Sequence, residues 1–365
     1  MMIGNWSWCG FLRLLRVELR QLMAVNASDR RWQMPLAAAL ASGCPLLVGA
    51  YFDRLEYGLI SSLGGLVFLY LPNTPLHHRM VSLMACAFGM TACFTFGTLS
   101  HFYPLLLTPV LTGITILVTM ICRFYRLGPP GSLFFVMASA IGAYSSVDAM
   151  QVPLHVGLMA MGCLMACAIA FIYSLIILRI QEPQEVAPLP PASFDFVVFE
   201  PVMIGLFTGI SLASAQLLQL DRAYWVPVSC LTVMQGMSLR AVWNKQVHRI
   251  VGTAIGLLLS LGLLALPLDK WTVALMVILL SFIVETAVVR HYGVAVIFIT
   301  PLTLFLAEAA TLGHGAPAPV VYARFWDTVL GCVTGLVGGA CLHNPLFRRV
   351  AGQWIRSLIP GKLLP

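Results

Sequence analysis

The sequence predicts an all-α integral membrane protein of about twelve transmembrane helices, arranged as two parallel six-helix repeats with both termini in the cytoplasm. Three observations predict it: an apolar composition, recurring apolar windows and an internal repeat. Hydrophobic residues make up 59% of the 365-residue chain and charged residues 10%, and the mean hydropathy is +0.90. Soluble domains carry about 25% charged residues, so this composition favours a chain that lies in lipid.

Apolar windows of membrane-spanning length recur along the whole chain. A helix needs roughly 17–25 apolar residues to cross a hydrocarbon core of about 30 Å. The windows cover residues 34–52, 55–71, 80–99, 102–122, 132–150, 153–178, 197–218, 223–239, 250–268, 270–289, 292–311 and 322–342. Because their number is even, both termini are expected on the same side of the membrane.

The distribution of basic residues places that side in the cytoplasm. With the N-terminus inside, the cytoplasmic side receives five basic residues from the N-terminal tail, eight from loops and four from the C-terminal tail, out of 21 in the chain. This is the bias that orients inner-membrane proteins. The net charge of +7 therefore reflects topology, and we expect a multi-pass protein of a bacterial-type inner membrane that binds no nucleic acid.

Residues recur in order at a nearly constant offset, which indicates an internal duplication. The matched pairs are Gly43 with Gly209, Tyr57 with Tyr224, Arg123 with Arg290, Gly162 with Gly331, and Arg79 with Arg249. Because each half holds six windows, both halves enter the membrane from the same side. Parallel repeats of this kind are related by an axis along the membrane normal, and transporters commonly bind substrate where the repeats meet.

The duplication divides the chain into five segments. These are a basic amphipathic N-terminal segment at 1–33, the first repeat at 34–180, a Pro-rich cytoplasmic linker at 181–196, the second repeat at 197–342 and a basic cytoplasmic tail at 343–365. The mixed apolar and basic pattern at 11–24 predicts a helix that lies on the cytoplasmic leaflet. The basic tail is expected on the same surface.

The sequence carries no signal for catalysis, for a metal or for a cofactor. Nearly all of the ten cysteines lie in apolar windows, without a CxxC motif or a Cys/His cluster at metal-ligand spacing. No nucleophile–base arrangement or phosphate-binding glycine loop stands out. We therefore expect a protein that is not an enzyme and has no catalytic residues, metal or cofactor.

Charged residues inside the windows are the candidates for function, because a charge at mid-bilayer costs about 2.5–3.5 kcal/mol and usually faces the protein interior. Two helix faces combine such charges with small residues that allow close helix packing. One holds Arg324, Asp327, Gly331 and Gly335, and the other holds Arg249, Gly252 and Gly256.

Depth along the windows predicts two polar levels separated by an apolar middle, as a gated path for an anion would need. The outer level holds Glu308, Arg324 and Asp327, and the inner level holds Glu200, Glu285 and Arg249. A structural alternative is that Arg324 and Asp327 neutralise each other, and that Lys245 and Arg249 are ordinary cytoplasmic loop charges.

The second half resembles a known family. The pattern Tyr224-Trp225-Val-Pro227, a short basic loop and then Arg249-x-x-Gly252-Thr253-x-x-Gly256 are similar to the fusaric-acid-resistance (FUSC) family, as is Arg324-x-x-Asp327-x-x-x-Gly331. The resemblance implies a multi-span inner-membrane protein that exports small organic, often aromatic, carboxylates with the proton gradient as a driving force. Many members carry a sizeable soluble cytoplasmic domain, and only the Pro-rich linker stands in its place.

Three functions fit these features: an exporter of small organic anions, a passive organic-anion channel, and a membrane scaffold that transports nothing. We favour the exporter. Its anion path would use Arg324, Arg249, Tyr224, Trp225 and Lys245, and Glu285 and Glu308 would exchange protons. The four acids Asp327, Glu308, Glu285 and Glu200 are candidates for proton coupling or, alternatively, for buried charge. The expected partners are the organic anion and the lipid bilayer. The sequence does not specify a homo-oligomer or a periplasmic partner.

Overall fold

A computed structural model describes residues 22–28, 30–145, 147–186, 188, 193–308 and 317–358, and every regular element in these ranges is a helix. The predicted all-α class is confirmed. Most of the helix predicted at 11–24 and part of the Pro-rich linker lie outside the described residues.

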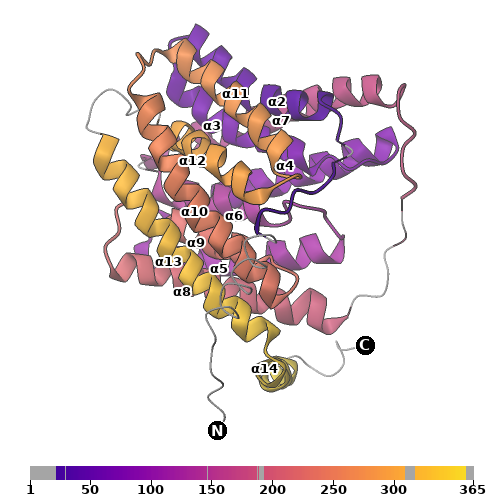
Figure 1. The fold of residues 1–365 in the computed structure, drawn as a ribbon, viewed down its shortest axis with the longest axis vertical. Coiled ribbons are helices and arrows are strands. Elements are labelled where there is room, and N and C mark those ends of the chain that lie inside the picture. Colours follow the sequence, from indigo (N-terminus) through magenta and orange to yellow (C-terminus); the bar gives the residue numbers. More distant parts are fainter. Residues whose placement is uncertain are drawn as a thin grey trace, which may run out of the picture.

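The described residues of the first half form six α-helices and two short 3-10 turns (Figure 1). Prolines occupy the first turns of α5 and α7, where a missing N–H costs little. The elements are α2 (Gln33–Tyr51), α3 (Leu55–Gly65), η1 (Leu66–Tyr70), α4 (Leu76–Ser100), α5 (Pro104–Phe124), α6 (Leu133–Tyr144), η2 (Ala149–Gln151) and α7 (Val152–Ile177).

The second half repeats this order and ends in one further helix. Ser238 and Asp269 cap α10 and α11 by accepting from the backbone N–H of Ala241 and Thr272, respectively. The elements are η3 (Asp195–Phe199), α8 (Glu200–Leu217), α9 (Trp225–Met234), α10 (Leu239–Leu264), α11 (Lys270–Ala287), α12 (Tyr292–Glu308), α13 (Pro317–His343) and α14 (Pro345–Leu358).

Each predicted window coincides with one helix or helix pair, but the helices differ in length. Among the described residues, eight helical segments are long and apolar enough to cross a membrane. The four remaining windows hold shorter apolar helices at Leu55–Tyr70, Leu133–Tyr144, Trp225–Met234 and Tyr292–Leu306. The ten residues of α9 extend only about 15 Å, so twelve full crossings stay a prediction.

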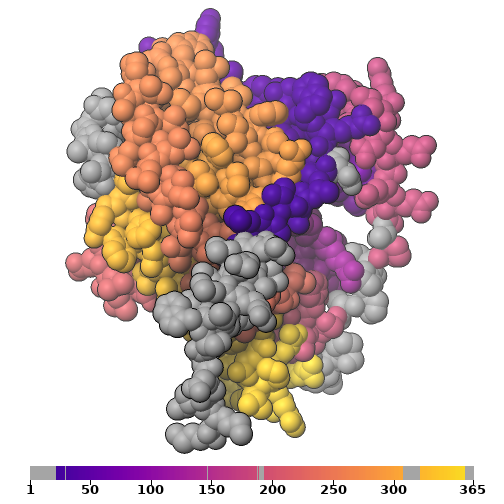
Figure 2. Space-filling model, viewed as in Figure 1, coloured from indigo at the N-terminus to yellow at the C-terminus, as the bar shows by residue number. Residues whose placement is uncertain are grey.

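The same pairs of helices pack in both halves. In the first half, α3 packs on α2 and α7, and α4 packs on α6 and α7; in the second, α9 packs on α8 and α13, and α10 packs on α12 and α13. The halves meet through α2 against α11 and α5 against α8. Figure 2 shows the indigo residues that precede α2 lying against the orange surface of the second half.

Close approach of these helices depends on glycines that the sequence pairs between the halves. A Cβ on Gly43 of α2 would overlap Ile278 of α11, and one on Gly209 of α8 would overlap Thr112 of α5. Each glycine thus lies at a contact between the halves. Arg79 and Arg249 are placed differently, since Arg79 lies in the first turn of α4 and Arg249 near the middle of α10.

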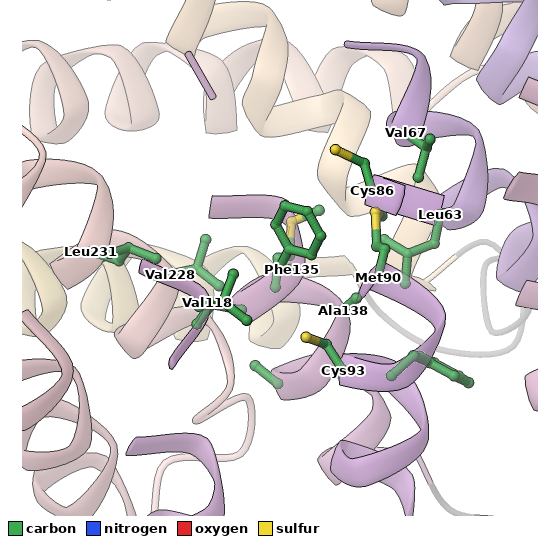
Figure 3. Close-up of a cluster of buried hydrophobic side chains, with 14 of the residues drawn as sticks. Leu63, Val67, Cys86, Met90, Cys93, Val118, Phe135, Ala138, Val228 and Leu231 are labelled. Carbon is green, nitrogen blue, oxygen red and sulfur yellow. The ribbon is translucent and has the colours of Figure 1, made fainter. Parts of the chain in front are cut away.

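The largest apolar core lies in the first half and continues into α9. Figure 3 shows Leu63, Met90, Cys93 and Phe135 of the first half in one cluster with Leu231 of α9. The cysteines in this cluster are buried among apolar side chains. This core packs against one side of α9. Helices α13, α8 and α10 cover the other sides of α9.

Candidate functional site

The short helix α9 is the platform on which the candidate site is built. All ten of its residues are buried. Trp225 and Ser229 are four residues apart and therefore lie on the same face of α9, one turn from each other. Buried arginines from α13 and α10 reach these two residues, as the following contacts show.

Arg324 of α13 stacks on the indole ring of Trp225. Its Cζ lies 3.5 Å from the ring centroid, and its Nη2 donates to Thr303 Oγ1 of α12 at 3.3 Å. The residue is only 6% exposed. Cation–π contacts are strongest when the cation is removed from water, at about 2 kcal/mol or more, so this contact orients Arg324 toward α9 and α12.

Arg249 of α10 is also buried, and its hydrogen-bond partners are neutral. It is 6% exposed; Nη2 donates to Ser229 Oγ at 3.2 Å and Nη1 to the Tyr292 hydroxyl at 3.3 Å. Its Nε has no hydrogen-bond partner, and no carboxylate of the described chain lies within 4.0 Å of the guanidinium. A buried charge normally requires a counter-charge, so this position is suited to receive an anion.

Asp327 is the opposite case, a buried acid that forms no ion pair with a described residue. It is 0% exposed, and both carboxylate oxygens lack a hydrogen-bond partner among the described residues. No ion pair joins it to Arg324, three residues earlier on the same helix. The neutral Arg324–Asp327 pair weighed from the sequence is therefore not formed, because Arg324 is directed to Trp225 and Thr303.

The other candidate acids have partners that are distant in sequence. Glu285 Oε2 pairs with Arg30 Nη1 at 3.4 Å. Glu200 pairs with Arg123 of α5 and with Arg348 of α14, the latter at 3.1 Å. Glu308 is the last residue of α12, and its side chain lies outside the described part of the structure.

The two arginines lie closer in depth than the sequence predicts. Their contacts on α9, Trp225 and Ser229, are separated by one turn, or about 6 Å along the helix axis. The prediction that an apolar layer separates Arg249 from Arg324 is therefore wrong. The helices differ in length: α9 has ten residues and α10 has 26, and Arg249 near the middle of α10 reaches Ser229.

The remaining candidates lie around this pair. Lys245 is half-buried one turn before Arg249 on α10. Tyr224 precedes α9, and its ring centroid lies 5.0 Å from that of Trp225. The glycines line helix contacts, with Gly252 and Gly256 against α12, and Gly331 and Gly335 against α9.

Several neutral polar residues at the site carry no signal in the sequence. Ser229, Tyr292 and Thr303 hold the arginines, as described above. Beside them, Thr108 Oγ1 of α5 donates to Gln216 Oε1 of α8 at 2.8 Å, and Gln216 Nε2 donates to the hydroxyl of Tyr144 at 3.3 Å. The Tyr144 ring lies 5.9 Å from that of Tyr224, so this chain of contacts links the first half to α9.

Comparisons with known proteins agree on the kind of protein. Residues 210–338, from α8 to α13, match the family model described as fusaric acid resistance protein-like. The chain is 22% identical to an uncharacterized membrane protein, YvaC of Bacillus subtilis (strain 168), over 503 aligned residues that cover 94% of this chain and 80% of the relative. No solved structure matches the chain. The apolar helices and the membrane-protein relative thus indicate a multi-pass membrane protein. Residues 210–338, which hold the helices of the candidate site, are similar to the fusaric-acid-resistance family.

Proposed function

We propose that the protein is an inner-membrane transporter that exports small organic carboxylates, in particular aromatic ones, and that this flux is coupled to protons. The family suggests a transport or efflux role. The observation that carries the proposal is Arg249, a buried cation whose hydrogen-bond partners are neutral. A carboxylate is the planar anion that a guanidinium binds best, through two parallel hydrogen bonds.

The aromatic preference rests on the side chains that surround the arginines. Tyr144, Tyr224 and Trp225 form a ladder of rings 5.0–5.9 Å apart between centroids. Aromatic rings pack favourably at such distances, in offset or edge-to-face geometry. A benzoate-like substrate would place its charge at Arg249 and its ring against this ladder.

The proposal includes twelve crossings in two parallel repeats, with both termini in the cytoplasm. Identical helix pairings in the two halves support the duplication, as do the matched contacts of Gly43 and Gly209. The positive-inside bias supports the orientation. Because α6 of the first half packs against α9, the proposed path runs beside the seam between the repeats.

Uptake of labelled benzoate into inverted membrane vesicles tests the function, with and without an imposed pH gradient. Vesicles that lack the protein measure the leak of neutral benzoic acid through lipid. Charge-assisted hydrogen bonds contribute about 1.5–3 kcal/mol, so Arg249→Ala should reduce protein-dependent uptake roughly 10-fold or more. Arg179→Ala is the matched control, because Arg179 is exposed at the end of the first half.

The outcomes separate the three functions weighed from the sequence. Protein-dependent uptake that responds to the pH gradient and is lost in Arg249→Ala supports the proposal. Downhill uptake that ignores the gradient would instead support a passive channel. No protein-dependent uptake, with both variants folded, would support a scaffold.

A further inference from the structure

Asp327 is a buried carboxylate in a setting that does not stabilise its charge. It has no exposed surface and no hydrogen-bond donor among the described residues. An ionised carboxylate in an apolar interior is costly unless it is paired and hydrogen-bonded. Glu285 and Glu200, by contrast, are each held in an ion pair. Of these three intramembrane acids, Asp327 is the one to which a proton can bind without breaking an ion pair.

The charged and titratable groups around Asp327 come from several elements. Arg324 lies on the same helix, Asp221 and Arg222 lie in the loop before α9, and Tyr144 lies at the end of α6. On α10, which packs against α13, the charged group that faces inward is Arg249. The oxygens of Asp327 are hydrogen-bonded to none of these, so its charge responds to what binds nearby.

Asp327 lies one helical turn along α13 from a residue that packs beside the proposed anion position. Gly331, one turn further along α13, packs against Ser229 with its Cβ position 2.6 Å from Ser229 Cβ. Ser229 in turn accepts the hydrogen bond from Arg249. An anion at Arg249 therefore adds a second negative charge to the same buried contact of α9 and α13, where a low dielectric strengthens repulsion between like charges.

We infer that Asp327 takes up one proton when an organic anion binds at Arg249, so that proton and anion cross the membrane together. This rests on the proposed function. The carboxylate oxygen of Asp327 gains the proton as the anion enters and releases it as the anion leaves, and no other bond forms or breaks. A proton that accompanies the anion cannot also drive it out, so export follows the gradient of the carboxylate itself.

Proton uptake on binding tests this linkage without the leak that complicates transport. The purified protein in detergent is mixed with sodium benzoate in weakly buffered solution between about pH 6 and pH 8, where benzoate in solution stays ionised. A pH indicator reports protons taken up, and equilibrium dialysis of labelled benzoate reports binding. The wild type should take up as much as about one proton per bound benzoate, with affinity that falls as pH rises.

Asp327→Asn imitates the protonated acid and should bind benzoate with no proton uptake and no dependence of affinity on pH. Asp327→Glu keeps a titratable group and should retain proton uptake. Two controls should behave as wild type: Glu285→Gln removes another intramembrane acid, and His248→Gln removes a ring that lies 6.4 Å from Tyr292.

Benzoate binding by the wild type without proton uptake would overturn the inference and leave the transport proposal intact. The same holds if Asp327→Asn takes up protons as the wild type does, or if His248→Gln abolishes the uptake. A wild type that binds no benzoate would contradict the proposed substrate class, and this inference would fall with it.

Discussion

The contact of α3 with α7 in the first half and that of α9 with α13 in the second are built alike but carry different chemistry. Gly162 of α7 packs on Ser61 of α3, and Gly331 of α13 packs on Ser229 of α9. Ser61 Oγ donates to a backbone carbonyl, that of Leu158, at 2.8 Å. Ser229 Oγ instead accepts from the buried Arg249.

Close packing and buried charge are therefore separate properties of this fold. Two matched glycines make matched contacts, so the helix packing does not require the arginine. A buried charge costs stability. Two such charges belong to the second half: Arg249 contacts Ser229 of α9, and Asp327 lies on α13. The proposed function accounts for this difference between the halves, because the second half would carry the anion site while the first half carries the larger apolar core.

Substituting the matched glycines should produce the largest effect and should affect both halves. A Cβ at Gly162 would overlap the carbonyl of Ser61, and one at Gly331 would overlap that of Val226. Gly162→Ala and Gly331→Ala should each lower the free energy of unfolding by about 1–3 kcal/mol, because the backbones must separate. Unfolding in detergent measures this, and an unchanged stability in either variant would contradict the described contact.

Substituting the matched serines should separate packing from chemistry. Ser229→Ala removes one acceptor of Arg249 and should weaken benzoate binding by roughly 10-fold, since a hydrogen bond to a charged group contributes about 1.5 kcal/mol or more. Ser61→Ala removes only a bond to Leu158 and should leave the affinity unchanged. Equal losses of affinity in the two variants would indicate that the site is not confined to the second half.

The ion pair of Arg30 with Glu285 should contribute to stability and not to transport. Arg30 is partly exposed whereas Glu285 is buried, and Glu285→Gln should lower the free energy of unfolding by about 1 kcal/mol. The reversed pair, Arg30→Glu with Glu285→Arg, should restore most of this loss and transport benzoate as the wild type does. Loss of proton-dependent flux in Glu285→Gln would revive the coupling role predicted from the sequence.

The smallest expected effect on stability comes from the Asp53–Lys270 pair, at the opposite end of the contact between α2 and α11 from Glu285. Lys270 Nζ donates to Asp53 Oδ1 at 2.7 Å, and this hydrogen bond lowers the pKa of Asp53. The pair therefore stabilises the fold above the unfolded pKa of about 3.9, and this contribution is lost as pH falls through the lowered folded pKa. Melting curves at several acidic pH values should show a slightly weaker pH dependence for Asp53→Asn, because the pair is exposed.

The sequence predicts the helical class and the position of each apolar helix because hydrophobicity is a local property. It also identifies Arg249, Arg324 and Asp327, since charges in apolar windows are conspicuous. It cannot predict that Arg324 stacks on Trp225 while Asp327 remains without a partner, because two residues three apart on a helix face can be directed to different neighbours. Long-range partners such as Arg30 for Glu285 depend on the tertiary fold.

Depth is the other property that local reasoning misses. Counting residues within windows assumes helices of equal length, whereas α9 holds only ten residues. That error placed Arg249 and Arg324 on separate levels, whereas both reach α9 within one turn.

The most direct test of the account is the position of a bound aromatic anion. Crystals of the protein grown with 4-iodobenzoate allow the iodine to be located by its anomalous scattering. The account predicts an iodine peak beside α9, with the carboxylate within about 3 Å of the Arg249 guanidinium and no equivalent peak beside α3. The proposed anion site would be contradicted by an iodine peak between α2 and α11 or beside α3, with Arg249 still hydrogen-bonded only to Ser229 and Tyr292.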